Sequence, residues 1–266
     1  MNLLDHIVAS KKDEVARRKR DESLSSFRSY ELFSRTALSL SSNFGTGRPF
    51  GIIAEIKRAS PSSGEFGMDV DPSSLASSYS DGGASGISVL TDAEFFHGSL
   101  EDLRRVRESV SIPLLRKDFI IDEYQLHEAK AYGADAVLLI AAILDRNHLA
   151  DLASAADSLG LQYLVELYDA QEMDKLAFDV MRFIGVNNRD LRTFKVDLNR
   201  TVEIKRHLPA DVTIISESGI KYRAEIAYLR ENGIHGALIG ESLVKSQSPG
   251  TTLRELLKSQ VDAPAR

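Results

Sequence analysis

The sequence predicts an α/β protein built as a single (β/α)8 TIM barrel with an N-terminal helical extension. Three observations predict this fold. Eight short apolar runs, rich in β-branched residues, follow one another from residue 50 onward. Stretches with helical spacing separate these runs, and they carry acidic or capping residues early and often a glycine after their end. The part of the chain that holds the eight units also has the usual size of such a barrel.

The first 49 residues precede this repeating pattern. Near the amino terminus, apolar residues recur at helical spacing with charged residues on the opposite face, which predicts an amphipathic helix. These apolar residues are Leu3, Leu4, Ile7, Val8 and Val15. A serine-rich connection, SLSSNFGTGRPF, then leads into the first strand. We expect residues 1–49 to form an extension that packs over one end of the barrel, and we hypothesise that it caps the mouth and raises substrate affinity. Residues 50–259 are expected to form the barrel, and residues 260–266 a C-terminal tail.

The predicted strands and helices alternate along the rest of the chain. The strands are FGIIAEIK (50–57), GISVLT (86–91), IPLLRKDF (112–119), AVLLIAAI (136–143), QYLVELY (162–168), FIGVNN (183–188), TIISESG (213–219) and GALIGESL (236–243). The helices between them include residues 122–133, 145–160 and 221–232. A doubly wound open sheet is the competing fold. It is disfavoured because it would place eight runs in one open sheet and because no glycine-rich dinucleotide fingerprint follows the first run.

Composition excludes several classes of function. The 266 residues carry a net charge of −6, which disfavours a general nucleic-acid binder, since such proteins need a basic surface. The chain has no cysteine, which excludes disulfides, thiolate nucleophiles and cysteine metal sites and is compatible with a cytoplasmic location. The six histidines show no HxH or HExxH spacing, so we predict no metal site. No apolar run approaches the ~20 residues of a membrane span, and the sequence has neither a Walker A loop nor a GxSxG elbow.

The third predicted strand places three charges inside an apolar run, IPLLRKDFII at 112–121. Residues two apart on a strand point to the same side, so Leu115, Lys117 and Phe119 share a face. In a barrel of parallel strands, the carboxyl ends surround the active site. Lys117 is therefore expected at the mouth of the barrel, where a charged side chain indicates chemistry. An ion pair that closes the end of the barrel is the structural alternative.

Other predicted strands also end in charged or polar residues. These are Glu55 and Lys57 on the first strand, Glu166 on the fifth, Asn187 and Arg189 on the sixth, and Glu217 on the seventh. Their convergence predicts acid–base chemistry on an anionic substrate, because opposed charges at close range shift the pKa values of lysines and carboxylates. Phe96, Phe119 and Tyr168 lie near strand ends as well, where an aromatic side chain either contacts a substrate ring or packs at the rim.

A phosphate site is predicted at the ends of the seventh and eighth strands, within SESGIK (216–221) and IGESLV (239–244). Barrels frequently hold phosphate there with loop amides and a short helix. Gly219 and Gly240 would let the backbone approach the ligand, and Ser218 would add a hydroxyl group. An ordinary turn is the alternative reading of these residues.

Seven segments of the chain follow one another in a recognisable order. They are IIAEIKRASPSSG (52–64), SVLTDAEFFHGS (88–99), LLRKDFIIDEYQ (114–125), VELYD (165–169), IGVNNRDLRTF (184–194), ISESGI (215–220) and LIGESLV (238–244). Together they resemble the motifs of the indole-3-glycerol phosphate synthase family, and the resemblance covers nearly the whole chain. It implies a step of tryptophan biosynthesis that needs no cofactor. In this step 1-(2-carboxyphenylamino)-1-deoxyribulose 5-phosphate closes to indole-3-glycerol phosphate, with loss of carbon dioxide and water.

The resemblance also implies roles for individual residues. Lys117 would be the general acid that protonates the ketone oxygen as the aromatic ring attacks, and Glu166 would be its acid–base partner in dehydration. Lys57 and Glu55 would assist, with their split between substrate placement and proton transfer left open. We expect Lys117 to suit its role because it stands among like charges and apolar residues. The implied substrate-binding residues are Ser60, Phe96, Phe119, Leu138, Asn187, Arg189, Glu217, Ser218, Gly219, Leu238 and Gly240.

Three alternatives stay open. A class I aldolase would use a strand-end lysine to form a Schiff base with a carbonyl substrate. The sugar-phosphate isomerase of the same pathway resembles the chain less, and its usual cysteine base has no counterpart here. A non-catalytic barrel would use the same lysines and glutamates only to bind a phosphorylated ligand. The expected partner is a small phosphorylated substrate, with neither nucleic acid nor membrane, and the chain is expected to be a monomer or a weak homo-oligomer.

Overall fold

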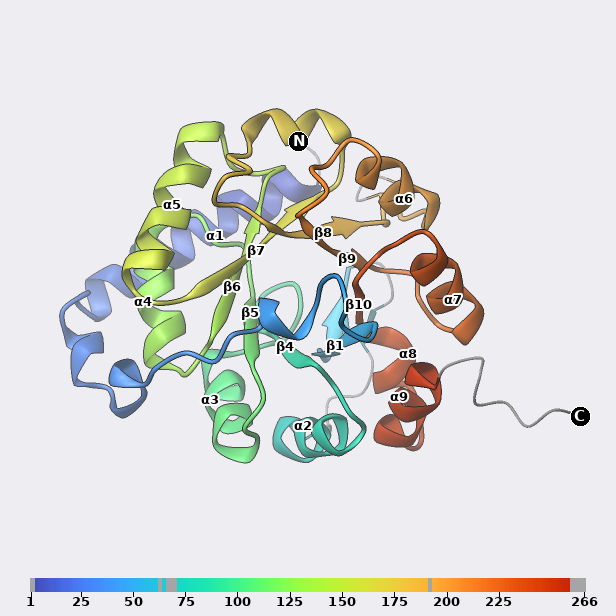
Figure 1. The fold of residues 1–266 in the computed structure, drawn as a ribbon. Coiled ribbons are helices and arrows are strands. Elements are labelled where there is room, and N and C mark those ends of the chain that lie inside the picture. The colour runs from blue at the N-terminus through green and yellow to red at the C-terminus, as the bar shows by residue number, and fades with distance from the viewer. Residues whose placement is uncertain (1–2, 62–63, 66–70, 191–192, 259–266) are drawn as a thin grey trace, which may run out of the picture.

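The computed structural model describes residues 3–61, 64–65, 71–190 and 193–258. Eight parallel strands close into a barrel in the order β1-β10-β9-β8-β7-β6-β5-β4. They are β1 (Gly51–Ile56), β4 (Gly86–Leu90), β5 (Leu114–Lys117), β6 (Ala136–Ile140), β7 (Gln162–Leu167), β8 (Phe183–Asn187), β9 (Thr213–Glu217) and β10 (Gly236–Ile239). Each strand lies inside one of the eight predicted runs, so the predicted TIM barrel is confirmed (Figure 1).

Helices surround the barrel on the outside (Figure 1). They are α2 (Pro72–Asp81), α3 (Leu100–Ser109), α4 (Glu123–Ala131), α5 (Arg146–Ser158), α6 (Asn199–Lys205), α7 (Arg223–Glu231), α8 (Glu241–Val244) and α9 (Pro249–Leu257). Aspartates set the start of three of them: Asp71 accepts the backbone N–H of Ser74 in α2, Asp122 accepts that of Tyr124 in α4, and Asp145 caps α5 in the same way. The connection between β7 and β8 departs from the predicted pattern, because it contains the 3-10 helix η4 (Ala170–Lys175). The short antiparallel pair β2 (Ala59–Ser60) and β3 (Gly64–Glu65) was not predicted from the sequence.

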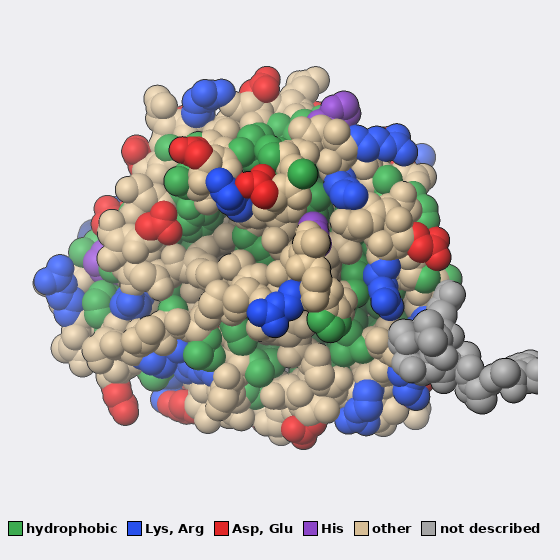
Figure 2. All heavy atoms as spheres, in the orientation of Figure 1, with side chains coloured by type: hydrophobic (Ala, Val, Ile, Leu, Met, Phe, Trp, Pro, Cys, Tyr) green, Lys and Arg blue, Asp and Glu red, His purple; other side chains and the backbone are tan. Residues whose placement is uncertain are grey.

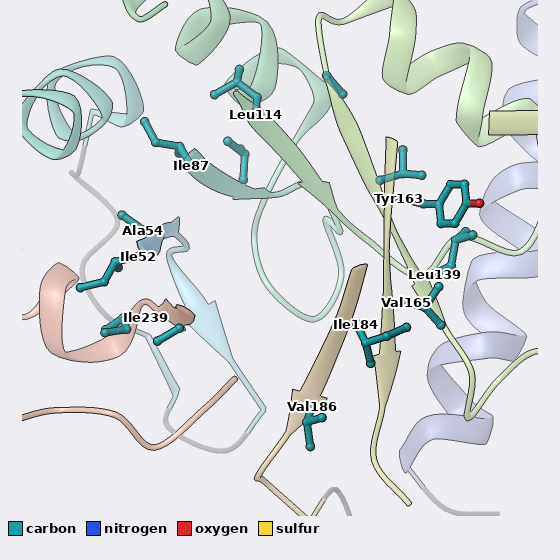
Figure 3. Packing of buried hydrophobic residues seen from close by; sticks show 14 of the residues in the cluster. Ile52, Ala54, Ile87, Leu114, Leu139, Tyr163, Val165, Ile184, Val186 and Ile239 are labelled. Atoms are coloured by element: carbon teal, nitrogen blue, oxygen red, sulfur yellow. The ribbon is translucent and has the colours of Figure 1, made fainter. Parts of the chain in front are cut away.

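The alternation of side chains along the strands builds two cores. Figure 3 shows outward residues that pack between the barrel and the helices, among them Ile52, Ala54, Ile87, Leu114, Leu139, Val165, Ile184, Val186 and Ile239. Inward residues fill the barrel itself, among them Ile53, Leu115, Ala136, Leu138, Ile140, Leu164, Ile215 and Leu238. Burying each large aliphatic side chain contributes about 1.5–3 kcal/mol. Two positions beyond Leu115, Leu164 and Ile215, the same inward face carries the next residues toward the mouth, which are Lys117, Glu166 and Glu217.

The N-terminal extension begins with α1 (Leu3–Asp21), followed by the 3-10 helices η1 (Ser26–Ser29), η2 (Glu31–Ser34) and η3 (Ser41–Asn43). α1 lies at the carboxyl-terminal end of the barrel, where Leu3, Leu4 and Ile7 line the central cavity. η1 and η2 pack against α4 on the outside of the barrel. Among the described residues, no helix has both the length and the apolar character that a membrane span requires.

The same extension also reaches the opposite end of the barrel, where Leu40 and Phe44 enter its interior as a plug. The Phe44 ring lies 5.7 Å from the ring of Phe183. Two strands begin with glycines that leave room for the plug, because a Cβ at Gly51 would lie 2.4 Å from Phe44 and a Cβ at Gly86 would lie 2.4 Å from Leu40. In Figure 1 the chain crosses the barrel end that faces the viewer, and Figure 2 shows that end filled by protein atoms, with charged side chains mostly around its rim. The extension therefore covers both ends of the barrel, where the sequence led us to expect one.

Candidate active site

A cavity opens at the carboxyl ends of the barrel strands and gathers most of the predicted site residues. Those that line it are Glu55, Lys57, Ser60, Phe96, Lys117, Phe119, Leu138, Glu166, Asn187, Arg189, Ser218, Gly219, Leu238 and Gly240. Glu217 differs from them, because its side chain is only 1% exposed and it meets the site through Lys117. Residues that are far apart in the sequence thus converge at one mouth, since they lie in the carboxyl-terminal parts of parallel strands or in the loops that follow them.

Carboxylates from three other strands surround the ammonium of Lys117. Its Nζ lies 2.5 Å from Oε2 of Glu217 and 3.7 Å from Oε2 of both Glu55 and Glu166. The other oxygen of Glu55 lies 2.7 Å from Nζ of Lys57. We call these five residues the Lys117 cluster. The expectation that Lys117 stands among like charges is wrong: the described residues that pair with its ammonium are all carboxylates, because β1, β7 and β9 direct glutamates to the point that β5 reaches from its own side.

These contacts set the protonation of the Lys117 cluster. Burial by itself would lower the pKa of Lys117, but the three glutamates outweigh burial and hold that pKa above its ordinary value. Burial raises the pKa of Glu217 to about 8; Glu166 adds to the rise and Lys117 opposes it. Burial also works against the charge of Glu55, but Lys57 and Lys117 outweigh it and lower the pKa of that carboxyl. Three carboxylates and two ammonium groups leave one negative charge in excess, so the cluster favours holding an additional proton near neutral pH.

Two glycines provide the space that the glutamates occupy. A Cβ at Gly185 of β8 would lie 2.1 Å from Oε1 of Glu217, and a Cβ at Gly240 would lie 2.4 Å from Oε1 of Glu55. Real Cβ atoms do not approach oxygen so closely, so any other residue at these positions would displace a carboxylate. Gly240 was predicted for close approach of the backbone to phosphate, and the structure gives it this second purpose. The role of Gly185 was not predicted.

The charges on either side of Lys117 in the sequence form a separate buried network, and of the two only Asp118 also lines the cavity. Nη2 of Arg116 lies 3.0 Å from Asp118 and 3.1 Å from Glu128 of α4. Nζ of Lys11, from α1, lies 2.9 Å from Asp118. Burial would raise the pKa of Asp118, but Lys11 and Arg116 outweigh it and hold that pKa well below its usual range. In the run RKD, the structural alternative therefore applies to Arg116 and Asp118, whereas Lys117 faces the site.

Phe96 and Phe119 form one side of the cavity. Their ring centroids lie 6.1 Å apart with the ring planes at 40°, and Leu138 and Leu238 add apolar surface within the same cavity. Tyr168, the third aromatic that the sequence analysis considered, lines a different hollow, where the guanidinium of Arg200 lies 3.9 Å from its ring centroid. The rim-packing alternative therefore holds for Tyr168.

The loop after β9 forms another side of the cavity. Ser218 and Gly219 both adopt left-handed backbone conformations, with φ of 68° and 84°. A buried asparagine that the sequence analysis did not select, Asn188, holds this loop. Its Nδ2 donates to the carbonyl oxygens of Glu217 at 2.9 Å and Ser218 at 3.2 Å, and its Oδ1 accepts from the hydroxyl of Thr201 at 2.7 Å. The only signal in the sequence was the doubled asparagine in VNNRD, where adjacent positions point to opposite sides of the strand.

Further cavity residues were also missed. They are Leu3, Leu4, Ile7, Pro61, Leu90, Asp118, Ile140, Phe194, Ile220, Lys221, Ile239 and Ser242. Glu241, within the predicted phosphate segment 239–244, lines the cavity as well. The apolar spacing of α1 predicted a buried face but not what that face would cover. The carboxylate of Glu241 lies 2.7 Å from Nζ of Lys245 and 3.9 Å from Nη2 of Arg189. Within the described part of the chain, no group of three or more histidine, aspartate or glutamate side chains is arranged to hold a metal ion.

The fold and this cavity define the class of protein. Proton donors and acceptors lie within a few ångströms of one another at the catalytic end of a TIM barrel, between an aromatic wall and a loop of backbone amides. This is the layout of a barrel enzyme that performs acid–base chemistry on a small anionic substrate.

The comparison with known families makes the assignment specific. Residues 4–256 match the model of the family described as indole-3-glycerol phosphate synthase. The indole-3-glycerol phosphate synthase of Desulfotalea psychrophila is 43% identical over 270 aligned positions, which cover 96% of this chain and 98% of that protein. The enzyme of the same name from Variovorax paradoxus is 40% identical, over 97% of this chain and 99% of its own. The chain belongs to the indole-3-glycerol phosphate synthase family, which confirms the resemblance seen in the sequence motifs.

Solved structures that resemble the chain at lower identity support the fold alone. A 3-hexulose-6-phosphate synthase aligns with a TM-score of 0.61 at 17% identity, over 78% of this chain and 98% of its own. The α subunit of tryptophan synthase from Legionella pneumophila aligns with a TM-score of 0.56 at 14% identity, over 78% of this chain and 91% of its own. The family and the relatives give the activity: the chain is a carboxy-lyase of tryptophan biosynthesis that forms indole-3-glycerol phosphate.

Proposed function

We propose that Lys117 is the general acid of ring closure. The observation that carries this proposal is the position of its ammonium at the cavity, between Glu217, Glu55 and Glu166. Attack of the aromatic carbon on the ketone develops negative charge on the ketone oxygen, and a proton delivered there removes that charge. A positioned acid typically contributes 10²- to 10⁴-fold to such a step. The carboxylates keep the amine protonated until an oxygen with higher proton affinity forms beside it.

Glu166 is proposed as the acid–base partner in dehydration. It lies 3.7 Å from Nζ of Lys117, and Nδ2 of Asn187 donates to its Oε1 at 3.4 Å. After carbon dioxide leaves, the former ketone oxygen departs as water, which requires one proton on that oxygen and the loss of another from the ring system. A carboxylate beside an ammonium can serve both transfers. Glu217 supports this exchange, since its raised pKa lets it hold a proton next to Lys117.

Glu55, on β1, and Lys57, which directly follows β1, are proposed to assist. Their 2.7 Å ion pair keeps the carboxylate of Glu55 charged and oriented toward Lys117. In this geometry Lys57 is available to the substrate carboxylate as a cation, while Glu55 fixes both ammonium groups. The kcat values of single variants at Lys57 and at Glu55 will show which of these two residues also transfers a proton.

The substrate is proposed to lie across the cavity with its aromatic and phosphate ends on different sides. Phe96, Phe119, Leu138 and Leu238 contact the carboxyphenyl ring, because they supply the apolar surface of the cavity. The phosphate group binds near Ser60, Ser218, Gly219 and Gly240, where a strand-end loop presents backbone N–H groups. Asn187, Arg189 and Glu217 orient the linking sugar chain between the two ends, Glu217 through its contact with Lys117.

The remaining expectations concern the chain as a whole. We infer that residues 1–49 act as an extension that raises affinity and that residues 50–259 form the barrel, which is supported by α1 lining the cavity. The predicted tail at 260–266 lies outside the described residues. A cytoplasmic location stays a proposal, with which the lack of cysteine is compatible. That the chain is a monomer or a weak homo-oligomer also stays a proposal.

The roles are tested by following indole fluorescence after mixing the carboxyphenylamino-deoxyribulose phosphate with wild type and with Lys117→Ala. The chain has no tryptophan, so a rising indole signal reports product. We expect kcat to fall about 10²- to 10⁴-fold in the variant while substrate still binds. Lys195→Ala, at an exposed lysine, serves as the matched control. A folded Lys117→Ala protein with near-normal kcat contradicts the general-acid role.

The aldolase alternative has its own test. A Schiff-base lysine must lose its proton to act as a nucleophile, and the carboxylates around Lys117 oppose that loss. Borohydride added during turnover is therefore expected to leave Lys117 unmodified in peptide mass spectra. A reduced substrate adduct on Lys117 would show that the enzyme forms a Schiff base, as a class I aldolase does.

A further inference from the structure

Lys11 of α1 is a buried cation outside the Lys117 cluster. Its side chain is 1% exposed, and its Nζ lies 2.8 Å from Asp92, 2.9 Å from Asp118 and 2.7 Å from Glu14. Taking an ammonium group out of water is costly unless several acceptors surround it. Here two of the three acceptors come from the loops at the barrel mouth, so Lys11 ties the extension to those loops.

The two aspartates each organise the loop that carries them. Oδ1 of Asp92 accepts the backbone N–H of Phe95 at 2.7 Å, which shapes the turn after β4. Oδ1 of Asp118 accepts the backbone N–H of Phe119 at 2.8 Å, and its Oδ2 accepts the hydroxyl of Thr91 at 2.6 Å. The ammonium of Lys11 therefore joins the start of one loop to the start of the next.

These two loops carry the two aromatic rings of the cavity. Phe96 follows the turn that Asp92 shapes, Phe119 follows Asp118 directly, and the ring centroids lie 6.1 Å apart. α1 holds the first loop at further points, because the ring of His6 packs edge-on against Phe95 at 5.7 Å and the hydroxyl of Ser10 donates to Glu94. The relative position of the rings thus depends on contacts from the extension.

The Lys117 cluster is held in a different way. Lys117 precedes Asp118 in the chain, but its ammonium is fixed by Glu55, Glu166 and Glu217 from strands on other sides of the barrel. A small movement of the loop after β5 would displace the Phe119 ring more than the Lys117 ammonium. Contacts of the substrate ring and the acid–base step are therefore separable by experiment.

We propose that Lys11 is a positioning residue that fixes the aromatic end of the substrate site by joining the loops after β4 and β5. This inference rests on the proposed function, in which Phe96 and Phe119 contact the carboxyphenyl ring. It assigns a specific task to the N-terminal extension: the extension sets the spacing between two side chains that recognise the substrate, in addition to covering the cavity.

The test compares Lys11→Met with Lys12→Met, which changes the adjacent, exposed lysine of the same helix. The readouts are KM and kcat for the substrate, and inhibition constants for 2-aminobenzoate and for inorganic phosphate, which probe the two ends of the site separately. For Lys11→Met we expect KM and the 2-aminobenzoate constant to rise about tenfold, with kcat and the phosphate constant changed less than about twofold. Lys12→Met is expected to match wild type in all four. Equal rises in both inhibition constants for Lys11→Met, or no rise in either, overturn the proposal.

A second variant separates positioning from stability. Lys11→Met leaves Asp92 without its buried cation, so we combine it with Asp92→Asn, which removes that unpaired charge but keeps an oxygen to accept the N–H of Phe95. If Lys11 only stabilises the fold, the double variant recovers both Tm and KM, and the proposal fails. If Lys11 positions the loops, Tm recovers while KM and the 2-aminobenzoate constant stay raised.

Phe96→Ala distinguishes failure of this inference from failure of the proposed function. If Phe96→Ala leaves the 2-aminobenzoate constant unchanged, the aromatic end of the site is wrongly placed, and both proposals fail. If Phe96→Ala raises that constant while Lys11→Met does not, the aromatic site stands and only the role of Lys11 is overturned.

Discussion

Lys117 and Glu217 meet across the full width of the barrel. Their strands, β5 and β9, have three strands between them in either direction around the sheet, yet Nζ and Oε2 lie 2.5 Å apart. The contact therefore depends on the diameter of the closed barrel and on the small residues that line it. It also places the proposed general acid on the barrel axis, where substrate atoms from either side of the cavity can reach it.

The raised pKa of Glu217 predicts a pH dependence of stability. Burial and Glu166 raise this pKa from 4.5 to about 8 in the folded state, so the folded protein binds the proton more tightly than the unfolded chain does. The stabilising contribution is complete below about pH 4.5 and is lost as pH rises through about 8, with a slope of at most about 1.4 kcal/mol per pH unit. Denaturant unfolding between pH 5 and 8 measures it, and Glu217→Gln should remove this component of the slope.

Glu203→Gln provides the control, because it changes an exposed glutamate of α6. Its unfolding free energy should follow the same pH curve as wild type. If the curves of Glu217→Gln and wild type run parallel from pH 5 to 8, Glu217 does not take up a proton on folding.

Gly185→Ala tests the space beside Glu217. The new methyl group would lie 2.1 Å from Oε1 of Glu217, so the carboxylate must move away from Lys117. We expect a loss of about 1–3 kcal/mol in the free energy of unfolding. Most of this loss should disappear when the substitution is made in a Glu217→Ala background, which urea titrations of the four proteins measure. Equal losses in the two backgrounds would locate the strain elsewhere, for instance at Leu164.

Asn188→Ala should loosen the loop after β9. The substitution removes the donors to the carbonyl oxygens of Glu217 and Ser218 and is expected to lower the free energy of unfolding by about 1–3 kcal/mol. Because Ser218 and Gly219 are proposed to bind phosphate, the inhibition constant for inorganic phosphate should rise about tenfold, the equivalent of 1.4 kcal/mol. Competitive inhibition assays measure it.

Thr201→Val is the matched control for this prediction. It removes the hydroxyl that donates to Oδ1 of Asn188 at 2.7 Å but leaves the bonds from Asn188 to the loop carbonyls. Stability should fall while the phosphate constant stays near that of wild type. A phosphate constant that is unchanged in folded Asn188→Ala would separate Asn188 from ligand binding.

Phe44→Ala should affect stability without affecting the site. Phe44 is 5% exposed and fills the end of the barrel opposite to the cavity, so its removal leaves a void that costs about 3–5 kcal/mol of unfolding free energy. KM should not change, because the barrel core separates the plug from the substrate. Leu38→Ala, at an exposed position in the same segment, should shift stability by less than about 0.5 kcal/mol. A rise in KM for Phe44→Ala would show that the two ends of the barrel are coupled.

Much of the fold follows from local sequence pattern. The strands could be predicted because β-branched runs such as AVLLIAAI are short and are bounded by helices with capping aspartates, for example Asp122 and Asp145. The site residues could be predicted because strand ends meet at one mouth in a parallel barrel, whichever strand they come from. The short pair β2–β3 and the 3-10 helix η4 were missed, since their segments carry no strong periodic pattern.

The electrostatic setting of Lys117 could not be predicted from local pattern. The two-residue period of a strand gives the side on which Lys117 lies, but the signs of the charges that meet it depend on which strands lie opposite. The same limit applies to Asp118, which pairs with Arg116 two residues before it and with Lys11 from a helix at the start of the chain. Sequence shows that such charges exist, and only the closed barrel shows which of them pair.

The path of the extension has a consequence for the order of assembly during synthesis. α1 leaves the ribosome before the strands of the barrel, but Lys11 finds its buried partners only when Asp92 and Asp118 have emerged and β4 and β5 have paired. Phe44 can pack only later, because its neighbour Gly236 is the first residue of β10, which follows the other barrel strands in the sequence. The extension is thus synthesised before the barrel but reaches its final place only after the barrel strands, and until then it remains accessible to chaperones and proteases.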